Sequence, residues 1–283
     1  MLKVIKQARA AVSLLNSDEV RRRAERPVHI GLVSATGSGY AEMEDFLIPA
    51  ALPRESRLGT MEMVHRASDP STPEKVDLVL YEEGLPCPKG AYHFYSDSPE
   101  MTIEQILHDH HDDLALALAR HYPGFRKPVV DRIVQAVSRE NALFAIATAL
   151  PNVVPNLLEL PWAFGEFASD TAFLTANQVR MAFLISAACG HEVGFTRQKA
   201  EVLSISASAF GWRALARELV GHIPMGGGLI PKGGIAYAGT YLVGKGLERY
   251  HHAESPFTRA EHKELYREAY QKGRAIAESA TRL

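Results

Sequence analysis

The chain has 283 residues, of which 46% are apolar and 23% are charged, and its formal net charge is −2. This is the composition of an ordinary globular protein, long enough for one large or two modest domains. The balanced charge gives no reason to expect nucleic acid as a partner. Two cysteines, Cys87 and Cys189, are too few for a disulfide framework, which favours a reducing, cytoplasmic compartment.

The first 27 residues predict two amphipathic helices. Apolar residues recur every three or four positions from Leu2 to Leu15, with lysine and arginine between them. Such a helix can lie on an anionic membrane or pack against its own domain, and we favour the second interpretation. The basic residues also interrupt the apolar stretch, so the segment lacks the pattern of a secretory signal. Ser17 is expected to cap the second helix, which ends before Pro27.

Four short segments predict β-strands, because each is rich in valine, tyrosine or other apolar residues and is bounded by turn-forming residues. A short helix is expected between the first two strands, from Ala41 to Ile48. Residues 28–98 are therefore expected to form a small α/β unit with three or four strands. The expected strands lie within residues 28–35, 61–68, 75–83 and 91–97.

Beyond residue 98 the strand signals stop, and apolar residues with helical spacing predict a bundle over residues 99–283. Capping boxes are expected at Thr102 with Gln105 and at Thr258 with Glu261. The expected fold class is therefore α+β, mostly α, with the boundary near Ser98. The expected helices are residues 102–122, 131–150, 171–190, 197–223, 235–252 and 258–280.

A glycine-rich turn follows the first strand and precedes a helix, which is how a phosphate-binding loop begins. That loop has the form G-x-x-x-x-G-K-[ST], in which backbone amides, a lysine and a hydroxyl hold the phosphates and Mg²⁺. With Gly39 as the second glycine, Ser34 replaces the first glycine and Tyr40 and Ala41 replace the lysine and the hydroxyl residue. Acidic residues fill the start of the helix, where they would repel a triphosphate.

These departures predict a vestigial phosphate loop rather than a working nucleotide site. A plain strand–turn–helix is the first alternative and an active NTPase is the second. A GTPase would also need an Asp-x-x-Gly motif at the end of a later strand, where this chain has Tyr81 in place of the aspartate. The candidate loop residues are Thr36, Gly37, Ser38 and Gly39.

The second candidate site is the run HDHHDD at residues 108–113. On a continuous helix, His108, His111 and Asp112 would share one face and could ligate a divalent metal. The same helix carries a separate apolar stripe, and no second motif supplies further ligands. We therefore expect a solvated surface and no metal, with a metal-dependent hydrolase as the alternative.

The apolar helices of the second half are expected to form a bundle rather than membrane spans. Residues 171–190 are long enough to cross a bilayer but carry Arg180 near the middle, which costs roughly 2.5–3.5 kcal/mol at a bilayer centre. A buried Arg180 needs a carboxylate partner or must reach the solvent edge. The expected partners are Glu159, Glu166 and Asp170.

Small residues recur every four positions in residues 235–252, at Ala236, Thr240 and Gly244. This spacing lets two helices approach each other closely, either in a membrane or in a bundle, and we favour the bundle.

The runs FLTANQVRMAFLISAACG and ALARELVGHIPMGGGLIPKGGIAYAGTYLVGKGLERYH resemble a bacterial helical domain of unknown function. That domain often follows a GTPase domain and occurs in YcjF-type inner-membrane proteins. The resemblance covers about residues 140–252. It implies that residues 28–98 are a degenerate GTPase-like unit, and the family has no catalytic residues to carry over.

Together these features predict a non-catalytic protein without a cofactor. It would act through a protein partner or self-association, or through peripheral contact with the inner membrane. One alternative is a weak nucleotide-binding switch in which the backbone amides of residues 36–39 hold a phosphate. The other is the metal-dependent hydrolase.

Overall fold

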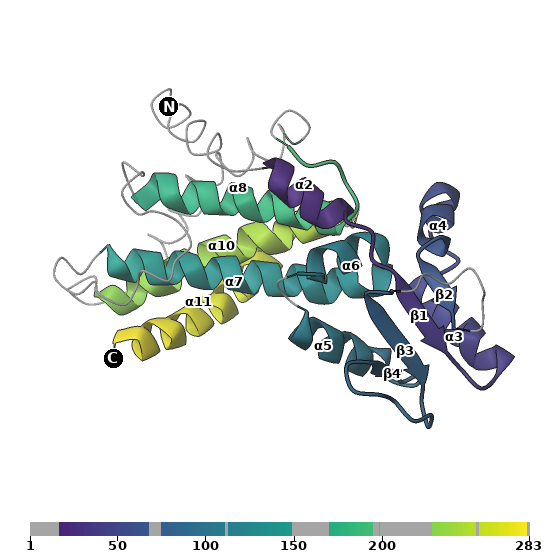
Figure 1. Ribbon diagram of the computed structural model, residues 1–283. Helices are drawn as coiled ribbons and strands as arrows, with labels where there is room; N and C mark the ends of the chain where they lie inside the picture. Colours follow the sequence, from purple (N-terminus) through teal and green to yellow (C-terminus); the bar gives the residue numbers. More distant parts are fainter. Residues whose placement is uncertain are drawn as a thin grey trace. The chain divides into compact units, whose positions relative to one another are not determined.

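The computed structural model describes residues 17–67, 75–110, 113–148, 170–194, 198, 228–252 and 255–281. The chain forms two compact units, and Figure 1 labels their elements. The sheet unit consists of Asp18–Asp131 with Ala187–Glu192, and the helical unit takes in the rest of the described chain. The division falls inside helix α7 (Arg126–Ala147) and not near Ser98.

The sheet unit contains four parallel strands in the order β2-β1-β3-β4, so the strand prediction is confirmed. In the central strand, Ile30 lies between Val64 and Leu78 in register. The strand that follows β1 in the chain, β2, pairs with one edge of β1, and the next strand, β3, pairs with its other edge. In such sheets ligands bind outside the carboxyl ends of the two strands between which the winding reverses, here β1 and β3. The strands are β1 (Ile30–Val33), β2 (Val64–Arg66), β3 (Leu78–Glu82) and β4 (Tyr92–Phe94).

Two short helices connect β1 with β2, whereas the sequence predicted one. The helix α3 (Gly37–Leu47) begins four residues before Ala41, because the Thr36 hydroxyl accepts a hydrogen bond from the Gly39 amide at 3.0 Å. The helix α4 (Arg54–Met61) was not predicted. It buries only Thr60, so its sequence carries no apolar periodicity.

The helix predicted over residues 102–122 consists of two described helices, α5 (Pro99–Asp109) and α6 (Ala115–His121). The capping box at Thr102 is wrong, because α5 begins three residues earlier, at Pro99. The Thr102 hydroxyl instead donates to the His93 carbonyl at 2.9 Å and accepts from the Tyr95 amide at 3.2 Å. The remaining helices of the unit are α2 (Ser17–Glu25) and the 3-10 helix η1 (Pro123–Phe125).

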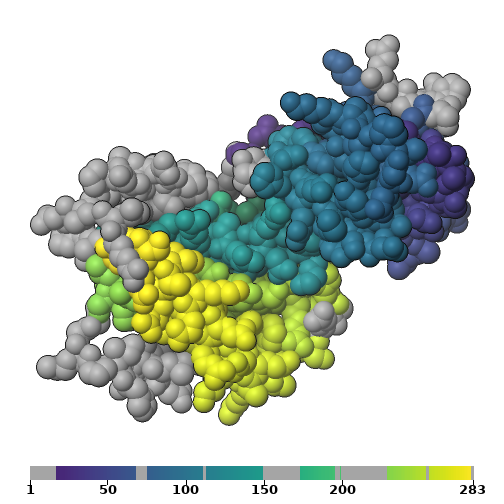
Figure 2. All heavy atoms as spheres, turned by 90° about the horizontal axis from the view of Figure 1, so that it is seen from below, coloured from purple at the N-terminus to yellow at the C-terminus, as the bar shows by residue number. Residues whose placement is uncertain are grey.

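The helical unit contains most of α7 with α8 (Asp170–Ala188), α10 (Leu229–His251) and α11 (Arg259–Thr281). The capping box of α11 is confirmed, because Thr258 and Glu261 each accept a hydrogen bond from the other's amide. Figure 2 shows α11, in yellow, forming a broad stretch of the surface of this unit. The helix predicted over residues 197–223 lies outside the described residues apart from Gln198.

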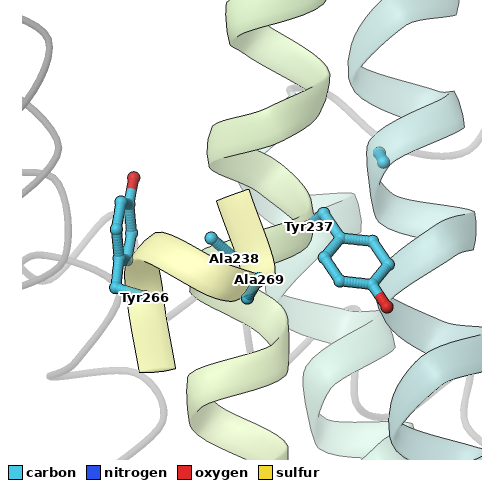
Figure 3. Packing of buried hydrophobic residues seen from close by; sticks show 5 residues of the cluster. Tyr237, Ala238, Tyr266 and Ala269 are labelled. Atoms are coloured by element: carbon cyan, nitrogen blue, oxygen red, sulfur yellow. The ribbon is translucent and has the colours of Figure 1, made fainter. Parts of the chain in front are cut away.

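Close packing of α10 against α11 depends on small residues. Figure 3 shows Ala238 and Ala269 between the two helices, with Tyr237 and Tyr266 directed to opposite sides. A Cβ atom on Gly273 would lie 2.5 Å from the Cβ atom of Tyr237, so only glycine fits at this crossing. No described helix combines the length and the apolar composition that crossing a membrane requires.

The predicted stripe of small residues in α10 also packs inside the helical unit. Ala236 and Thr240 are 5% and 1% exposed, and Gly244 is buried. A Cβ atom on Gly244 would lie 2.6 Å from a methyl group of Val134 on α7. The stripe therefore brings α10 close to α7, as expected for a bundle.

Candidate functional site

A single carboxylate occupies the carboxyl ends of β1 and β3. Val33 and Tyr81 are paired in the sheet, so the next residues, Ser34 and Glu82, follow side by side. One carboxylate oxygen of Glu82 accepts hydrogen bonds from the Ser34 hydroxyl at 2.6 Å and the Ala35 amide at 3.0 Å. Its other oxygen accepts from the Thr36 hydroxyl at 3.3 Å.

These hydrogen bonds continue into the first turn of α3. The Ser34 hydroxyl oxygen accepts from the Thr36 amide at 3.0 Å. The Thr36 hydroxyl oxygen accepts from the Gly39 amide at 3.0 Å and from the Ser38 hydroxyl at 3.2 Å. The hydrogen bonds of the turn between β1 and α3 thus form a connected network, and the Glu82 carboxylate is the acceptor at which this network ends.

The charge of Glu82 is stabilised by these donors. The hydrogen bond from the Ser34 hydroxyl, followed by that from the Ala35 amide, holds the pKa of Glu82 below its usual value. The side chain is thus ionised at neutral pH and stands close to the amino end of α3. A fixed negative charge complements the positive end of the helix dipole there, as a bound phosphate would.

Three of the four predicted loop residues belong to the helix itself. Gly37, Ser38 and Gly39 form the first turn of α3, and Thr36 is its N-cap. A Cβ atom on Gly39 would lie 2.5 Å from the Ser34 hydroxyl oxygen and 2.6 Å from the Glu82 carboxyl group. The missing side chain of Gly39 therefore leaves space for the Glu82 carboxylate, in the place where a phosphate loop would hold a phosphate.

The residue at the lysine position of a phosphate loop, Tyr40, contacts a neighbouring strand. The guanidinium carbon of Arg66 in β2 lies 5.1 Å from the centre of the Tyr40 ring. Arg66 also forms a two-point ion pair with Glu44, at 2.7 Å and 2.8 Å. Tyr40 and Glu44 thus hold α3 against β2. The sequence predicted acidic residues at the start of this helix, but α3 begins at Gly37 and has no acidic residue in its first turn, so Glu44 lies further along the helix.

Of the HDHHDD run, His108 and Asp109 are the last two residues of α5, and His110 is its C-cap. His111 and Asp112 lie outside the described residues. Asp109 interacts with the ring of His108, at 3.0 Å, and accepts a hydrogen bond from the Tyr92 hydroxyl at 3.0 Å. Among the described residues, no three His, Cys, Asp or Glu side chains are grouped so that they could hold a metal ion.

The Tyr92 hydroxyl is a hydrogen-bond donor and not a base at this position. Burial raises the pKa of Tyr92 to about 12, with a further contribution from its hydrogen bond to Asp109. The pKa of Asp109 is lowered by its hydrogen bonds with His108 and Tyr92. These residues connect β4 with the end of α5.

In the helical unit, Arg180 pairs with Glu140 of α7. Arg180 also donates from Nε to the Asn177 side-chain oxygen at 2.9 Å, and Asn177 donates to Glu140 at 3.0 Å. Glu159 and Glu166 and the side chain of Asp170, the partners expected from the sequence, lie outside the described residues.

The same polar cluster joins three helices. The Asn177 side chain of α8 donates to Asn141 of α7 at 2.9 Å, and Asn141 donates to the Thr240 hydroxyl of α10 at 2.8 Å. Gln178 of α8 donates to the same hydroxyl at 3.3 Å. Because these side chains are buried and bonded to one another, they fix how the helices pack and do not line an open site.

Glu82 and Glu140 were both missed by the sequence analysis. The sequence places Glu82 at the end of an expected strand, but only the sheet order shows that this strand lies beside β1. Glu140 carries no comparable signal, since it is 40 residues away from Arg180.

Comparison of the chain with models of protein families, with curated proteins and with solved structures found no match. The resemblance of residues 140–252 to the helical domain of YcjF-type proteins therefore stays a prediction.

Proposed function

We propose that this chain is a non-catalytic interaction protein, in which a GTPase-like α/β unit without nucleotide binding is joined to a helical domain. The observation that carries the proposal is the Glu82 carboxylate at the amino end of α3. A phosphate group in a working loop would use the same amide and hydroxyl donors.

The electrostatics of the turn support the proposal. A phosphate that approached Ala35 and Thr36 would meet the ionised Glu82 and would have to displace it from three hydrogen bonds. No lysine follows Gly39 to compensate, because Tyr40 stands at that position and contacts Arg66. Acidic groups beside an anion raise the free energy of the complex, so nucleotide binding is disfavoured.

The helical unit supports a structural and interaction role. Its polar side chains Asn141, Asn177 and Arg180 form hydrogen bonds with one another and, through Arg180, an ion pair with Glu140. A catalytic site would instead need polar groups that a substrate can reach. The resemblance to the GTPase-associated helical domain also supports this role, because it implies that this chain acts in the cytoplasm through a protein partner. Peripheral contact with the inner membrane is part of the same proposal.

Calorimetry tests the proposal directly. The purified wild type is titrated with GTP and with ATP in the presence of Mg²⁺, and phosphate release is followed in parallel. The proposal predicts no measurable heat of binding and no hydrolysis above background.

The control variant is Gly39→Val, checked for folding by circular dichroism, because its side chain would fill the space beside Glu82. Micromolar binding by the wild type that disappears in this variant would contradict the proposal. That result would favour the nucleotide-binding switch.

A further inference from the structure

Two histidine rings contact each other across the first two strands of the sheet. The Nδ1 atom of His29, directly before β1, lies 3.0 Å from the Nε2 atom of His65 in β2. The two ring centroids are 5.2 Å apart, and the ring planes are inclined by 21°. Both side chains are half-buried. We call this pair the His29–His65 contact.

The register of the sheet places both rings on one face. Gly31 of β1 is paired with His65, and His29 precedes Gly31 by two residues, so the two histidines point to the same side. A Cβ atom on Gly31 would lie 3.3 Å from a methyl group of Val76 and 3.8 Å from Val79. Valine side chains therefore cover Gly31 on the face that carries the two rings.

The charged groups beside His29 are bonded to one another. The Asp77 carboxylate, before β3, accepts hydrogen bonds from the His29 amide at 2.9 Å and from Arg26 at 2.7 Å. The ring of His121, at the end of α6, lies 3.1 Å from the Arg26 carbonyl oxygen. Burial lowers the pKa of His121, so this third histidine adds no positive charge at neutral pH.

The charged groups around His65 are directed elsewhere. Arg66 follows His65 in β2 and so points to the opposite face of the sheet, where it pairs with Glu44 of α3. Glu62, at the end of α4, is exposed. The interaction that responds to the protonation of His65 is therefore its contact with His29.

A contact between two ring nitrogens limits how many protons the pair can carry. A hydrogen bond between imidazoles needs one N–H donor and one nitrogen that accepts. The neutral pair meets this requirement, and so does a pair with one additional proton. When both rings are protonated, two N–H groups face each other across 3.0 Å and two positive charges repel.

We propose that the His29–His65 contact makes the pairing of β2 with β1 sensitive to pH, so that β2 separates from β1 when both rings are protonated. The strand β2 is an edge strand of three residues. Backbone hydrogen bonds hold it at both ends, from the Ile30 amide to Met63 and from the Ala67 amide to Leu32, each at 2.8 Å. Its separation would uncover one edge of β1. This inference does not depend on the proposed function.

The expected direction is a loss of strand pairing in acid. Once the strands have separated, both histidines can be protonated, as free histidine is below about pH 6.5. The paired strands accept only one of these two protons. Each pH unit below that value should therefore shift the equilibrium toward separation by up to about tenfold, until the paired form also takes up the second proton.

Amide hydrogen exchange of the whole chain, followed by NMR between about pH 7 and about pH 5, tests the proposal. Protection factors are compared, because they correct for the intrinsic effect of pH on exchange. Protection of the Ile30 and Ala67 amides should fall by about tenfold or more in acid. The Leu80 amide, in the central part of the sheet, should keep its protection.

Two variants keep a hydrogen-bonding group in place but remove its titration. In His65→Gln the side-chain amide replaces Nε2, and in His29→Asn it replaces Nδ1. Either variant should remove the pH dependence at Ile30 and Ala67. The control is His93→Gln in β4, a half-buried histidine on the same face of the sheet, which should behave as the wild type does.

Several results would overturn the proposal. These are protection at Ile30 and Ala67 that does not change with pH, or the same pH dependence in His65→Gln and His29→Asn as in the wild type. An equal loss of protection at Leu80 would indicate general unfolding in acid and not the separation of β2. Loss of the pH dependence in His93→Gln would assign it to another histidine. Should one of the two contact variants fail to fold, the other decides.

Discussion

Each of the two units contains a carboxylate that collects hydrogen bonds, but the two stand in different surroundings. In the sheet unit, Glu82 accepts from Ser34 and Ala35 at the end of two paired strands, and it is half-buried. In the helical unit, the side chain of Glu140 is 22% exposed and accepts from Arg180 and Asn177 between helices.

The difference shows two ways in which a fold provides a partner for a charged group. The register of β1 and β3 brings Glu82 beside the turn, so the backbone determines the contact. Glu140 and Arg180 meet only because α7 and α8 pack together, so the contact depends on helix packing. Replacing Glu82 should therefore weaken the hydrogen bonds of the turn between β1 and α3. Replacing Arg180 should instead leave the charge of Glu140 without its cation between packed helices.

The largest effect is expected for Arg180→Met. In this variant Glu140 keeps the hydrogen bond from Asn177 but loses its ion pair with the arginine. Because the charge of Glu140 is then poorly paired, the free energy of unfolding should fall by about 1–3 kcal/mol. Urea denaturation of the wild type and the variant measures the difference.

The double variant Arg180→Met with Glu140→Met is the control for that comparison. It removes both charges, so its stability should lie closer to the wild type than that of either single variant. Additive losses in the double variant would show that the ion pair does not couple the two helices.

A smaller loss is expected for Thr240→Val in the same cluster. The buried Thr240 hydroxyl accepts hydrogen bonds from Asn141 and Gln178, and valine would leave both amide groups without this acceptor. A loss of about 1–2 kcal/mol follows from the desolvation of unpaired donors. The matched control Thr240→Ser keeps the hydroxyl and should be clearly less destabilised in the same denaturation experiment. If the serine variant, which keeps the hydroxyl, lost as much stability as the valine variant, the role given to the Thr240 hydroxyl would be contradicted.

The turn in the sheet unit should respond locally to Glu82→Gln. The amide side chain removes the charge that the Ser34 hydroxyl and the Ala35 amide stabilise, so hydrogen exchange at Ala35 and Thr36 should become faster. The neighbouring exposed Glu83 provides the control, since Glu83→Gln alters the same net charge without touching the turn. Identical exchange rates in the two variants would contradict the role given to Glu82.

The smallest effect is expected for Gly39→Ala. The new Cβ would approach the ends of the Ser34 and Glu82 side chains, which can rotate away, and alanine favours the helix by up to about 1 kcal/mol. Overall stability should therefore change little, while exchange at Ala35 increases. Gly273→Ala is the contrasting variant, because its Cβ would meet the Cβ of Tyr237 and the backbone of Gly234, which cannot rotate away. A larger loss for Gly39→Ala than for Gly273→Ala would refute this distinction.

The fold class was predictable because local patterns determine most of it. Valine-rich runs gave β1 and β3, and the Thr258–Glu261 capping box gave the start of α11. The helix α4 escaped prediction because it buries only Thr60, and helix prediction relies on apolar spacing.

The contacts of the candidate site were not predictable from local patterns. Ser34 and Glu82 are 48 residues apart, and Arg180 and Glu140 are 40 residues apart. Only strand order or helix packing brings such residues together. The glycine pattern at residues 36–39 identified the right turn, but the anionic group beside it comes from β3.

The titration of the Glu82 carboxyl group tests the central claim most directly. Carbon-detected NMR would follow the side-chain carboxyl shift of Glu82 with pH in the wild type and in Ser34→Ala. In the wild type the pKa should lie below the usual glutamate value, so the contribution of Glu82 to stability is complete above that usual value. That contribution should be lost as the pH falls through the lowered pKa. In Ser34→Ala the pKa should rise, because the hydroxyl is the main group that lowers it. A wild-type Glu82 that titrates at the usual value and does not respond to Ser34→Ala would contradict the account.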